Sequence, residues 1–142
     1  MIFKIAGSAI VMLCGALYSH NAQKAVSQEL SEAERLLEIF KYLRNEIDEF
    51  DTPIYEALRA KGVEGSIEKI FSSVSSEGLR GAISEARLMG RGYKKEELRV
   101  CDRVVSRLEE KKKLLDAKAK ETKVISRVKG LGTAAAAVIL LL

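Results

Sequence analysis

Charged side chains are missing from both ends of this 142-residue chain and are dense between them. The stretches Ile5–Tyr18 and Gly130–Leu142 carry no charge, whereas all 20 Asp and Glu residues lie between Glu29 and Glu121. Uniformly apolar helices need lipid or protein around them, while a charged middle section needs water along at least one face. The layout therefore predicts a helical body that is attached to a membrane at two points.

The composition favours helices over sheets. Ala, Leu and Ile supply most of the 47% hydrophobic fraction, aromatic residues make up 6%, and proline occurs once. Without the two ends, about 110 residues remain, enough for one small domain. We expect an all-α fold, an antiparallel helical bundle with hydrophobic membrane segments at both termini. The net charge of +4 does not indicate nucleic acid binding, because basic and acidic residues alternate through the body.

The N-terminal apolar stretch approaches the thickness of a bilayer. Ile2–Tyr18 contains only one charge, Lys4, and as a helix it would reach roughly 25 Å against a hydrocarbon core of roughly 30 Å. A cleaved signal peptide is the alternative reading, since a positive charge followed by an apolar run is its usual pattern. No Ala-x-Ala-like cleavage site follows this run. We therefore expect residues 1–19 to be retained as a transmembrane helix.

The C-terminal stretch, residues 130–142, is apolar on every side but would cover only about 20 Å as a helix. A short or tilted membrane segment is expected, and a buried core helix is the alternative. Cations dominate the approach to it: Lys118, Lys120, Lys123, Arg127 and Lys129. By the positive-inside rule these residues place the body, residues 20–129, in the cytoplasm and beside anionic lipid.

The body begins with a long amphipathic helix. From Val26 to Phe50 apolar residues recur at spacings of three and four, which places them on one helical face. The helix should end near Phe50, because Asp51, Thr52 and Pro53 form a stop and restart signal. In this reading Thr52 is the N-cap of the next helix and Pro53 its first residue.

Glycines divide the rest of the body into short helices. A second helix should end near Lys61 before Gly62, and Ser66 can cap a third. A fourth contains two glycines, Gly78 and Gly81, and is followed by a break at Gly90 and Gly92. One long helix of about 36 residues is then expected from Lys94 to Gly130.

No group of residues suggests catalysis or cofactor binding. Gly90 and Gly92 lack the third glycine of a dinucleotide fingerprint, and the single histidine, His20, cannot form a triad within the body. Four carboxylates crowd the end of the first long helix, but their spacing is not that of a calcium loop: Glu46, Asp48, Glu49 and Asp51. Cys14 and Cys101 fall in different environments and are not expected to pair. We predict a protein without enzymatic activity, cofactor, metal or small-molecule substrate.

Two segments resemble a known family. Asn45–Ile47, a short acidic stretch and Thr52–Leu58 are similar to the signature of stage III sporulation protein AB, although Ile54 stands where that family usually has Leu. The tail from Lys129, with its Leu-Gly pair and aliphatic end, resembles the family's C-terminus. The central region is shorter than is usual in the family and lacks its Leu-Gly-x-x-Leu-Gly turn. The residues that match the signature turn are Glu46, Ile47, Thr52, Pro53, Glu56 and Ala57.

This resemblance implies a mother-cell membrane component of a secretion-like channel apparatus needed for endospore formation. Its cytosolic body would resemble the helical bundle of the type II secretion platform protein. The implied partners are membrane lipids and other sporulation channel proteins, including a secretion-type ATPase that the subunit docks as a scaffold. Two alternatives remain: a secreted or surface helical-bundle binding module released by signal cleavage, and a membrane-tethered signalling helix pair.

Overall fold

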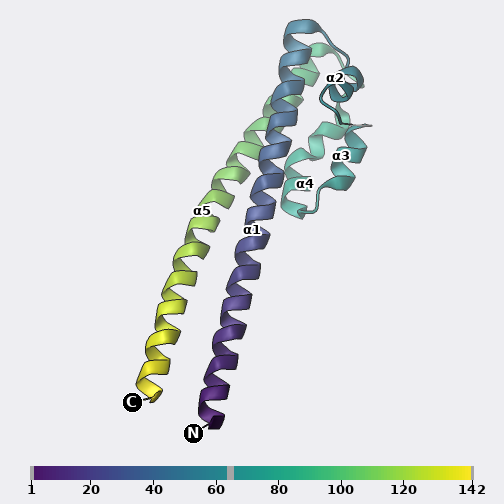
Figure 1. Cartoon of the computed structure of the whole chain (residues 1–142). Helices are drawn as coiled ribbons and strands as arrows, with labels where there is room; N and C mark the ends of the chain where they lie inside the picture. The colour runs from purple at the N-terminus through teal and green to yellow at the C-terminus, as the bar shows by residue number, and fades with distance from the viewer. Residues whose placement is uncertain (1, 64–65, 142) are drawn as a thin grey trace. The chain divides into compact units, whose positions relative to one another are not determined.

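The computed structural model describes residues 2–63 and 66–141. Over these residues the chain forms five α-helices and one short 3-10 helix and contains no strand (Figure 1). The chain divides into two compact units. We call residues 1–28 with 115–142 the terminal unit and residues 29–114 the central unit. The prediction of an all-α fold is confirmed.

Helix α1, Ile2–Phe50, contributes residues to both units. The predicted apolar stripe is buried along its central-unit part, where side chains at spacings of three and four form the core. Phe50 is the exception: it was expected on this stripe, but it lies at the last residue of the helix and is 67% exposed. The buried members are Ala33, Leu36, Leu37, Ile39, Phe40, Leu43 and Ile47.

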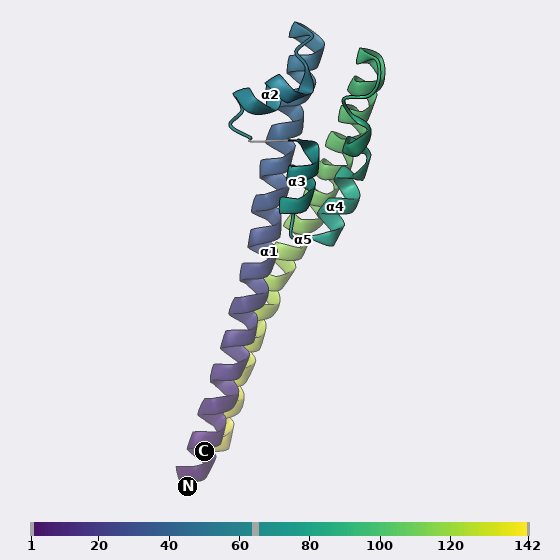
Figure 2. The same cartoon turned by 90° about the vertical axis from the view of Figure 1, so that its right-hand side faces the viewer.

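Three α-helices of seven residues each follow, and the 3-10 helix η1 continues from the third: α2 Ile54–Ala60, α3 Ile67–Ser73, α4 Glu77–Ile83 and η1 Ser84–Leu88. Gly62, with a φ of 76°, directly follows the end of α2, as expected. Helices this short are not stable alone and depend on tertiary packing. Each contributes buried apolar side chains to the central unit, for example Leu58, Ile70 and Leu79. Figure 2 shows them gathered beside the central-unit part of α1.

Helix α5, Lys94–Leu141, begins where the sequence predicts, after a turn in which Gly90 has a φ of 88°. The predicted end at Gly130 is wrong, because the helix continues through Gly130 and Gly132. A glycine inside a helix costs only about 1 kcal/mol relative to alanine, and the four alanines that follow are the best helix formers. The hydroxyl of Thr133 donates to the Lys129 carbonyl oxygen at 2.9 Å within the helix.

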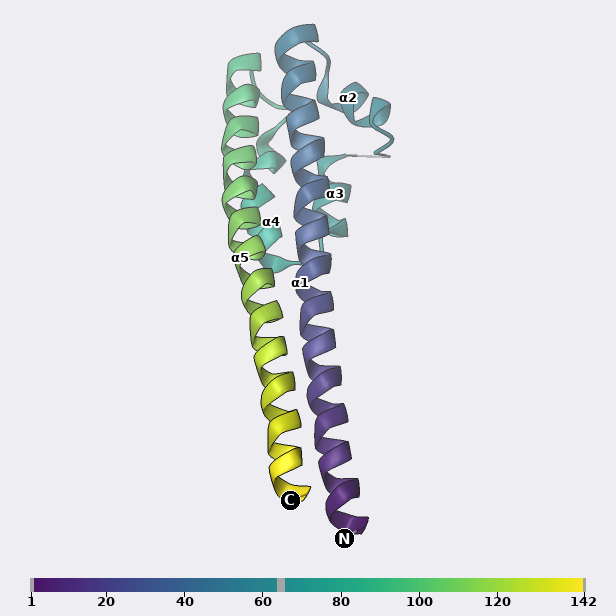
Figure 3. The same ribbon diagram turned by 60° about the vertical axis from the view of Figure 1, so that its left-hand side comes forward.

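Within the central unit α1 and α5 run antiparallel (Figure 3). Lys112 Nζ lies 3.5 Å from Glu34 Oε1, and further along Arg44 Nε lies 2.6 Å from Asp102 Oδ1. Residue numbers therefore rise along α1 as they fall along α5. The α5 side of the core is formed by Val100, Cys101, Val104 and Leu108.

Within the terminal unit the same two helices are linked by a hydrogen bond of 2.6 Å from Ser19 Oγ to Ser126 Oγ. Among the described residues, no helix is both long enough and apolar enough to cross a membrane. The expected membrane segments at 1–19 and 130–142 are therefore not supported by the structure. The predicted division into those segments and a body at 20–129 stays a prediction.

Candidate functional site

The signature turn joins α1 to α2 through the last turn of α1. Asp51 has a φ of 52°, and the backbone N–H of Thr52 then donates to the Glu46 carbonyl oxygen at 3.3 Å. The Thr52 hydroxyl donates to the Glu46 carboxylate at 3.1 Å. The prediction that Thr52 caps α2 is therefore wrong, because its side chain is bonded back to α1. Pro53 occupies the N-cap position instead of the first helical position and makes no side-chain capping bond.

The remaining signature residues fix α2 in place. The Pro53 carbonyl oxygen accepts hydrogen bonds from the N–H groups of Glu56 and Ala57 at 2.9 and 3.0 Å. Ile47 and Ala57 are buried in the central unit, at 2% and 0% exposure, whereas Glu56 is exposed. The structure thus brings the signature together as a turn that fixes the path of the chain. Of the signature residues, Pro53 and Glu56 are exposed to solvent.

The carboxylates near this turn do not converge. Asp48 lies 3.8 Å from Arg44 and Asp51 lies 2.6 Å from Lys94, so each is directed toward a cation. Over residues 2–63 and 66–141, no three His, Cys, Asp or Glu side chains are placed to hold a metal ion together.

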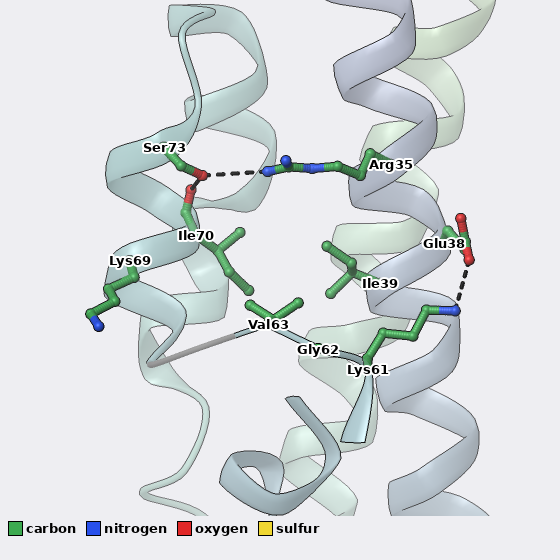
Figure 4. A pocket seen from close by; sticks show the side chains of 9 residues that line it. All are labelled: Arg35, Glu38, Ile39, Lys61, Gly62, Val63, Lys69, Ile70 and Ser73. Carbon is green, nitrogen blue, oxygen red and sulfur yellow. Dashed lines mark hydrogen bonds and ion pairs between the residues drawn. The ribbon is translucent and has the colours of Figure 1, made fainter. Parts of the chain in front are cut away.

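A cleft of about 480 Å³ opens in the central unit between α1, the end of α2 and α3 (Figure 4). We call it the basic cleft, because its lining includes three cationic side chains and one carboxylate. The sequence did not single it out. Its lining residues are Arg35, Glu38, Ile39, Lys61, Gly62, Val63, Lys69, Ile70 and Ser73.

The floor of the basic cleft is aliphatic. Figure 4 shows Ile39, Val63 and Ile70 directed toward one another from three different segments. Ile39 and Ile70 are 6% and 3% exposed. An apolar floor of this kind takes up an aliphatic or aromatic side chain, while polar groups at the rim set its orientation.

Cations and hydroxyls form the rim. Lys61 Nζ lies 2.7 Å from Glu38 Oε1 and 5.3 Å from the centre of the Tyr42 ring. The hydrogen bond from Lys61, reinforced by its charge, lowers the pKa of Glu38, whereas burial raises the pKa of Tyr42. Arg35 Nη2 reaches Ser73 Oγ at 3.5 Å, a long hydrogen bond that leaves the guanidinium able to engage a ligand.

The arrangement suits binding more than chemistry. Ser73 donates its hydroxyl proton to the Ile70 carbonyl oxygen at 2.8 Å and accepts from Arg35, so it bridges two groups and is not activated as a nucleophile. Arg35 and Lys61 can both hydrogen-bond to a carboxylate, and Arg35 can do so in a bidentate manner. The basic cleft therefore matches an acidic segment that also carries an apolar side chain.

The five predicted membrane-proximal cations are all exposed on the terminal-unit part of α5. They do not share one face. Lys120, Lys123 and Arg127 follow spacings of three and four, whereas Lys118 and Lys129 are separated by three full turns and share the other side. Lys129 alone among the five lines a groove of the terminal unit.

Large apolar side chains of the terminal unit face outward from both helices. Within the described residues of this unit, the exposed members on α1 are Ile10, Val11, Leu13, Leu17 and Tyr18, and those on α5 are Val124, Ile125, Val128, Leu131 and Ile139. Large exposed apolar surfaces are uncommon on monomeric soluble proteins and often mark interaction sites. Two of these side chains, Tyr18 and Ile125, also line the groove of the terminal unit.

These features define a class: a helical protein with a small bundle as its central unit and, as its terminal unit, a pair of helices with exposed apolar side chains. A family model described as stage III sporulation protein AB matches residues 4–86. No curated protein and no solved structure matches the chain. The chain therefore belongs to the stage III sporulation protein AB family and is a sporulation protein. The match includes the signature turn and the basic cleft and stops before α5.

Proposed function

We propose that this protein is a non-enzymatic membrane platform subunit of a secretion-like channel apparatus needed for endospore formation. In this proposal the terminal unit associates with the mother-cell membrane and the central unit docks cytoplasmic partners, among them a secretion-type ATPase. The observation that carries the proposal is that the two units differ in how far their apolar side chains are exposed. The central unit buries its apolar stripe, whereas the terminal unit exposes apolar side chains from both of its helices.

The distribution of charged residues also distinguishes the terminal unit from the central unit. In the terminal unit seven Lys and Arg residues accompany two Asp and Glu residues, whereas the central unit has seventeen against eighteen. Each lysine or arginine near an anionic bilayer contributes about 1 kcal/mol of attraction. Exposed apolar side chains together with excess positive charge favour the surface of a membrane over bulk water.

Membrane association is tested with the full-length chain in vesicle flotation. We expect it to float with vesicles that contain phosphatidylglycerol, and a substantial part to remain bound after a high-salt wash because of the apolar contact. A chain that stays in the lower fraction with every vesicle composition would remove the basis of the proposal. Mass spectrometry of the mature protein distinguishes the secreted alternative, which requires the loss of the N-terminal residues.

The docking role is tested by complementation in the sporulating host. A strain that lacks the gene should fail to complete spores and should be restored by the wild-type chain. Replacing Arg35 and Lys61 together by glutamate should abolish restoration, because the basic cleft then repels an acidic segment. The matched control is Lys95→Glu, an exposed cation on α5 that does not line the cleft. Equal restoration by both variants would contradict the role of the cleft.

Membrane orientation is tested by thiol labelling in intact cells. Cys101 is buried and does not interfere, so Cys14→Ala combined with Glu56→Cys places a single accessible thiol on the exposed face of α2. A membrane-impermeant reagent should label it only after the cells are opened. Labelling in intact cells would overturn the cytoplasmic placement of the central unit.

A further inference from the structure

A groove of about 820 Å³ runs along the terminal unit between residues 12–23 of α1 and residues 122–133 of α5. We call it the terminal groove. Its volume lies within the range of about 300–1,000 Å³ that is typical of pockets for small ligands. Both helices contribute small side chains, which leave the space open.

Polarity changes from one end of the terminal groove to the other. Because Ser19 meets Ser126 in an antiparallel pair, Met12 lies toward the same end as Thr133, and Gln23 lies toward the same end as Thr122. The first end is apolar and small, and its one hydroxyl, that of Thr133, already donates to backbone carbonyl oxygens of its own helix. The apolar end is lined by Met12, Gly15, Ala16, Gly130 and Gly132, and the polar end by Ser19, His20, Gln23, Thr122 and Ser126. Two apolar side chains, Ala22 and Ile125, also line the polar end, and Tyr18 lies between the two ends.

The charge of the lining is positive. Among the residues that the structure describes, Lys129 lines the terminal groove and no carboxylate does. Side chains on an α-helix lean toward its N-terminus, so Lys129 leans along α5 toward Ser126 and the polar end. The Thr122 hydroxyl already donates to the Lys118 carbonyl oxygen and Ser19 donates to Ser126. The donors left at the polar end are therefore the ammonium group of Lys129, the Ser126 hydroxyl and the Gln23 amide, whereas the other end is apolar. This change in polarity along the groove complements an amphiphilic ligand with an anionic headgroup and an apolar tail.

We propose that the terminal groove binds one acidic phospholipid. Its phosphate lies at the polar end beside Lys129, where Ser126 and Gln23 donate hydrogen bonds, and one acyl chain lies along the glycine-lined end. This inference rests on the proposed membrane association and adds to it a defined lipid site. A bound lipid would fill the space between α1 and α5 and hold the two helices together.

Native mass spectrometry of the full-length chain, released from mixed phosphatidylglycerol and phosphatidylcholine micelles, tests the site directly. We expect one phosphatidylglycerol to be retained per chain in preference to phosphatidylcholine. Gly15→Leu should abolish retention, because the added side chain meets no protein atom within 4 Å of its Cβ and occupies the groove. The matched control is Gly7→Leu on the same helix, which also meets nothing within 4 Å, does not line the groove and should retain the lipid.

A second pair of variants tests the headgroup contact. Lys129→Gln should weaken retention of phosphatidylglycerol about fivefold, the effect of one lysine on binding to an anionic lipid. Lys120→Gln removes an equal charge outside the groove and should leave retention within about twofold, since an exposed cation acts only through the screened field.

Three results would overturn the lipid site: retention by Gly15→Leu equal to that of Gly7→Leu, full displacement of the lipid by glycerol phosphate alone, or a lipid-free dimer that Gly15→Leu abolishes. Flotation of the same variants separates the two proposals. If every variant floats with vesicles and retention does not differ, the lipid site fails and membrane association stands. If the wild-type chain does not float, membrane association itself fails.

Discussion

Truncation of Phe40 to alanine is expected to be the most damaging single change in the central unit. Phe40 has no exposed surface and lies on α1 among side chains buried from several helices. Removing a buried phenylalanine ring costs about 3–5 kcal/mol, from lost transfer free energy and from the cavity that remains. For a unit of this size each kcal/mol lowers the melting temperature by about 4–8 °C, so a decrease of at least about 12 °C is expected.

The chain supplies its own control for this prediction. Phe50 belongs to the same helix and is 67% exposed, so Phe50→Ala should change stability by less than about 0.5 kcal/mol. Both variants are compared with the wild type in urea unfolding followed by circular dichroism at constant detergent concentration. The reasoning is refuted if the two substitutions lower stability equally, or if Phe40→Ala costs under about 1 kcal/mol, because the core would then not be packed around that ring.

Three further outcomes follow from individual side chains. Burial raises the pKa of the Cys101 thiol to about 12, so a thiol reagent near neutral pH should modify exposed Cys14 at once and Cys101 only on unfolding, which a time course of labelling measures. The hydrogen bond from Lys41 lowers the folded-state pKa of Glu109 below its ordinary value of 4.5. This stabilisation is complete above that value and is lost as pH falls through the folded pKa, so the stability deficit of Lys41→Met should shrink as pH falls below 4.5, measured by denaturant unfolding at several pH values. Asp51 has a φ of 52°, so Asp51→Val should destabilise the chain by about 1–2 kcal/mol more than Asp51→Gly in denaturant unfolding.

Short-range sequence patterns were sufficient to predict the two long helices and several of the helix ends. The periodic apolar residues of α1 predicted its buried face, and its end at Phe50 followed from the Asp-Thr-Pro signal. The end of α2 before Gly62 needed a positive φ at residue 62, which glycine adopts without strain. The start of α5 at Lys94 followed from the preceding glycines.

Errors arose where a residue had two possible roles. The sequence predicts a helix end at Gly130, but α5 continues through it because the alanines beyond it strongly favour helix. The sequence also predicts Thr52 as the cap of α2, but its hydroxyl donates to Glu46 in α1 instead. In both cases the sequence fits either role, and only the hydrogen bonds of the folded chain decide between them.

The basic cleft could not be found from sequence. Arg35 lies in the middle of a long charged helix, and Lys61 lies at the end of a short one, so each resembles an ordinary solvated cation. They come to the same cleft because the turn after Phe50 reverses the chain and α3 packs Ile70 over Ile39. The positions of Arg35 and Lys61 in the sequence do not indicate that the two side chains line the same cleft. The terminal groove was missed for a similar reason, since its lining comes from opposite ends of the sequence.

The uneven distribution of charge between the two units determines how salt should act on this protein. All of the net positive charge belongs to the terminal unit, because the central unit has one more acidic than basic residue. Exposed cations and exposed apolar side chains occur together in the terminal unit. At physiological ionic strength electrostatic attraction is screened beyond about 8 Å, while apolar contact does not weaken with salt. Attachment of this chain to any anionic surface should therefore have two components, a rapid one that added salt removes and a persistent one that only detergent removes.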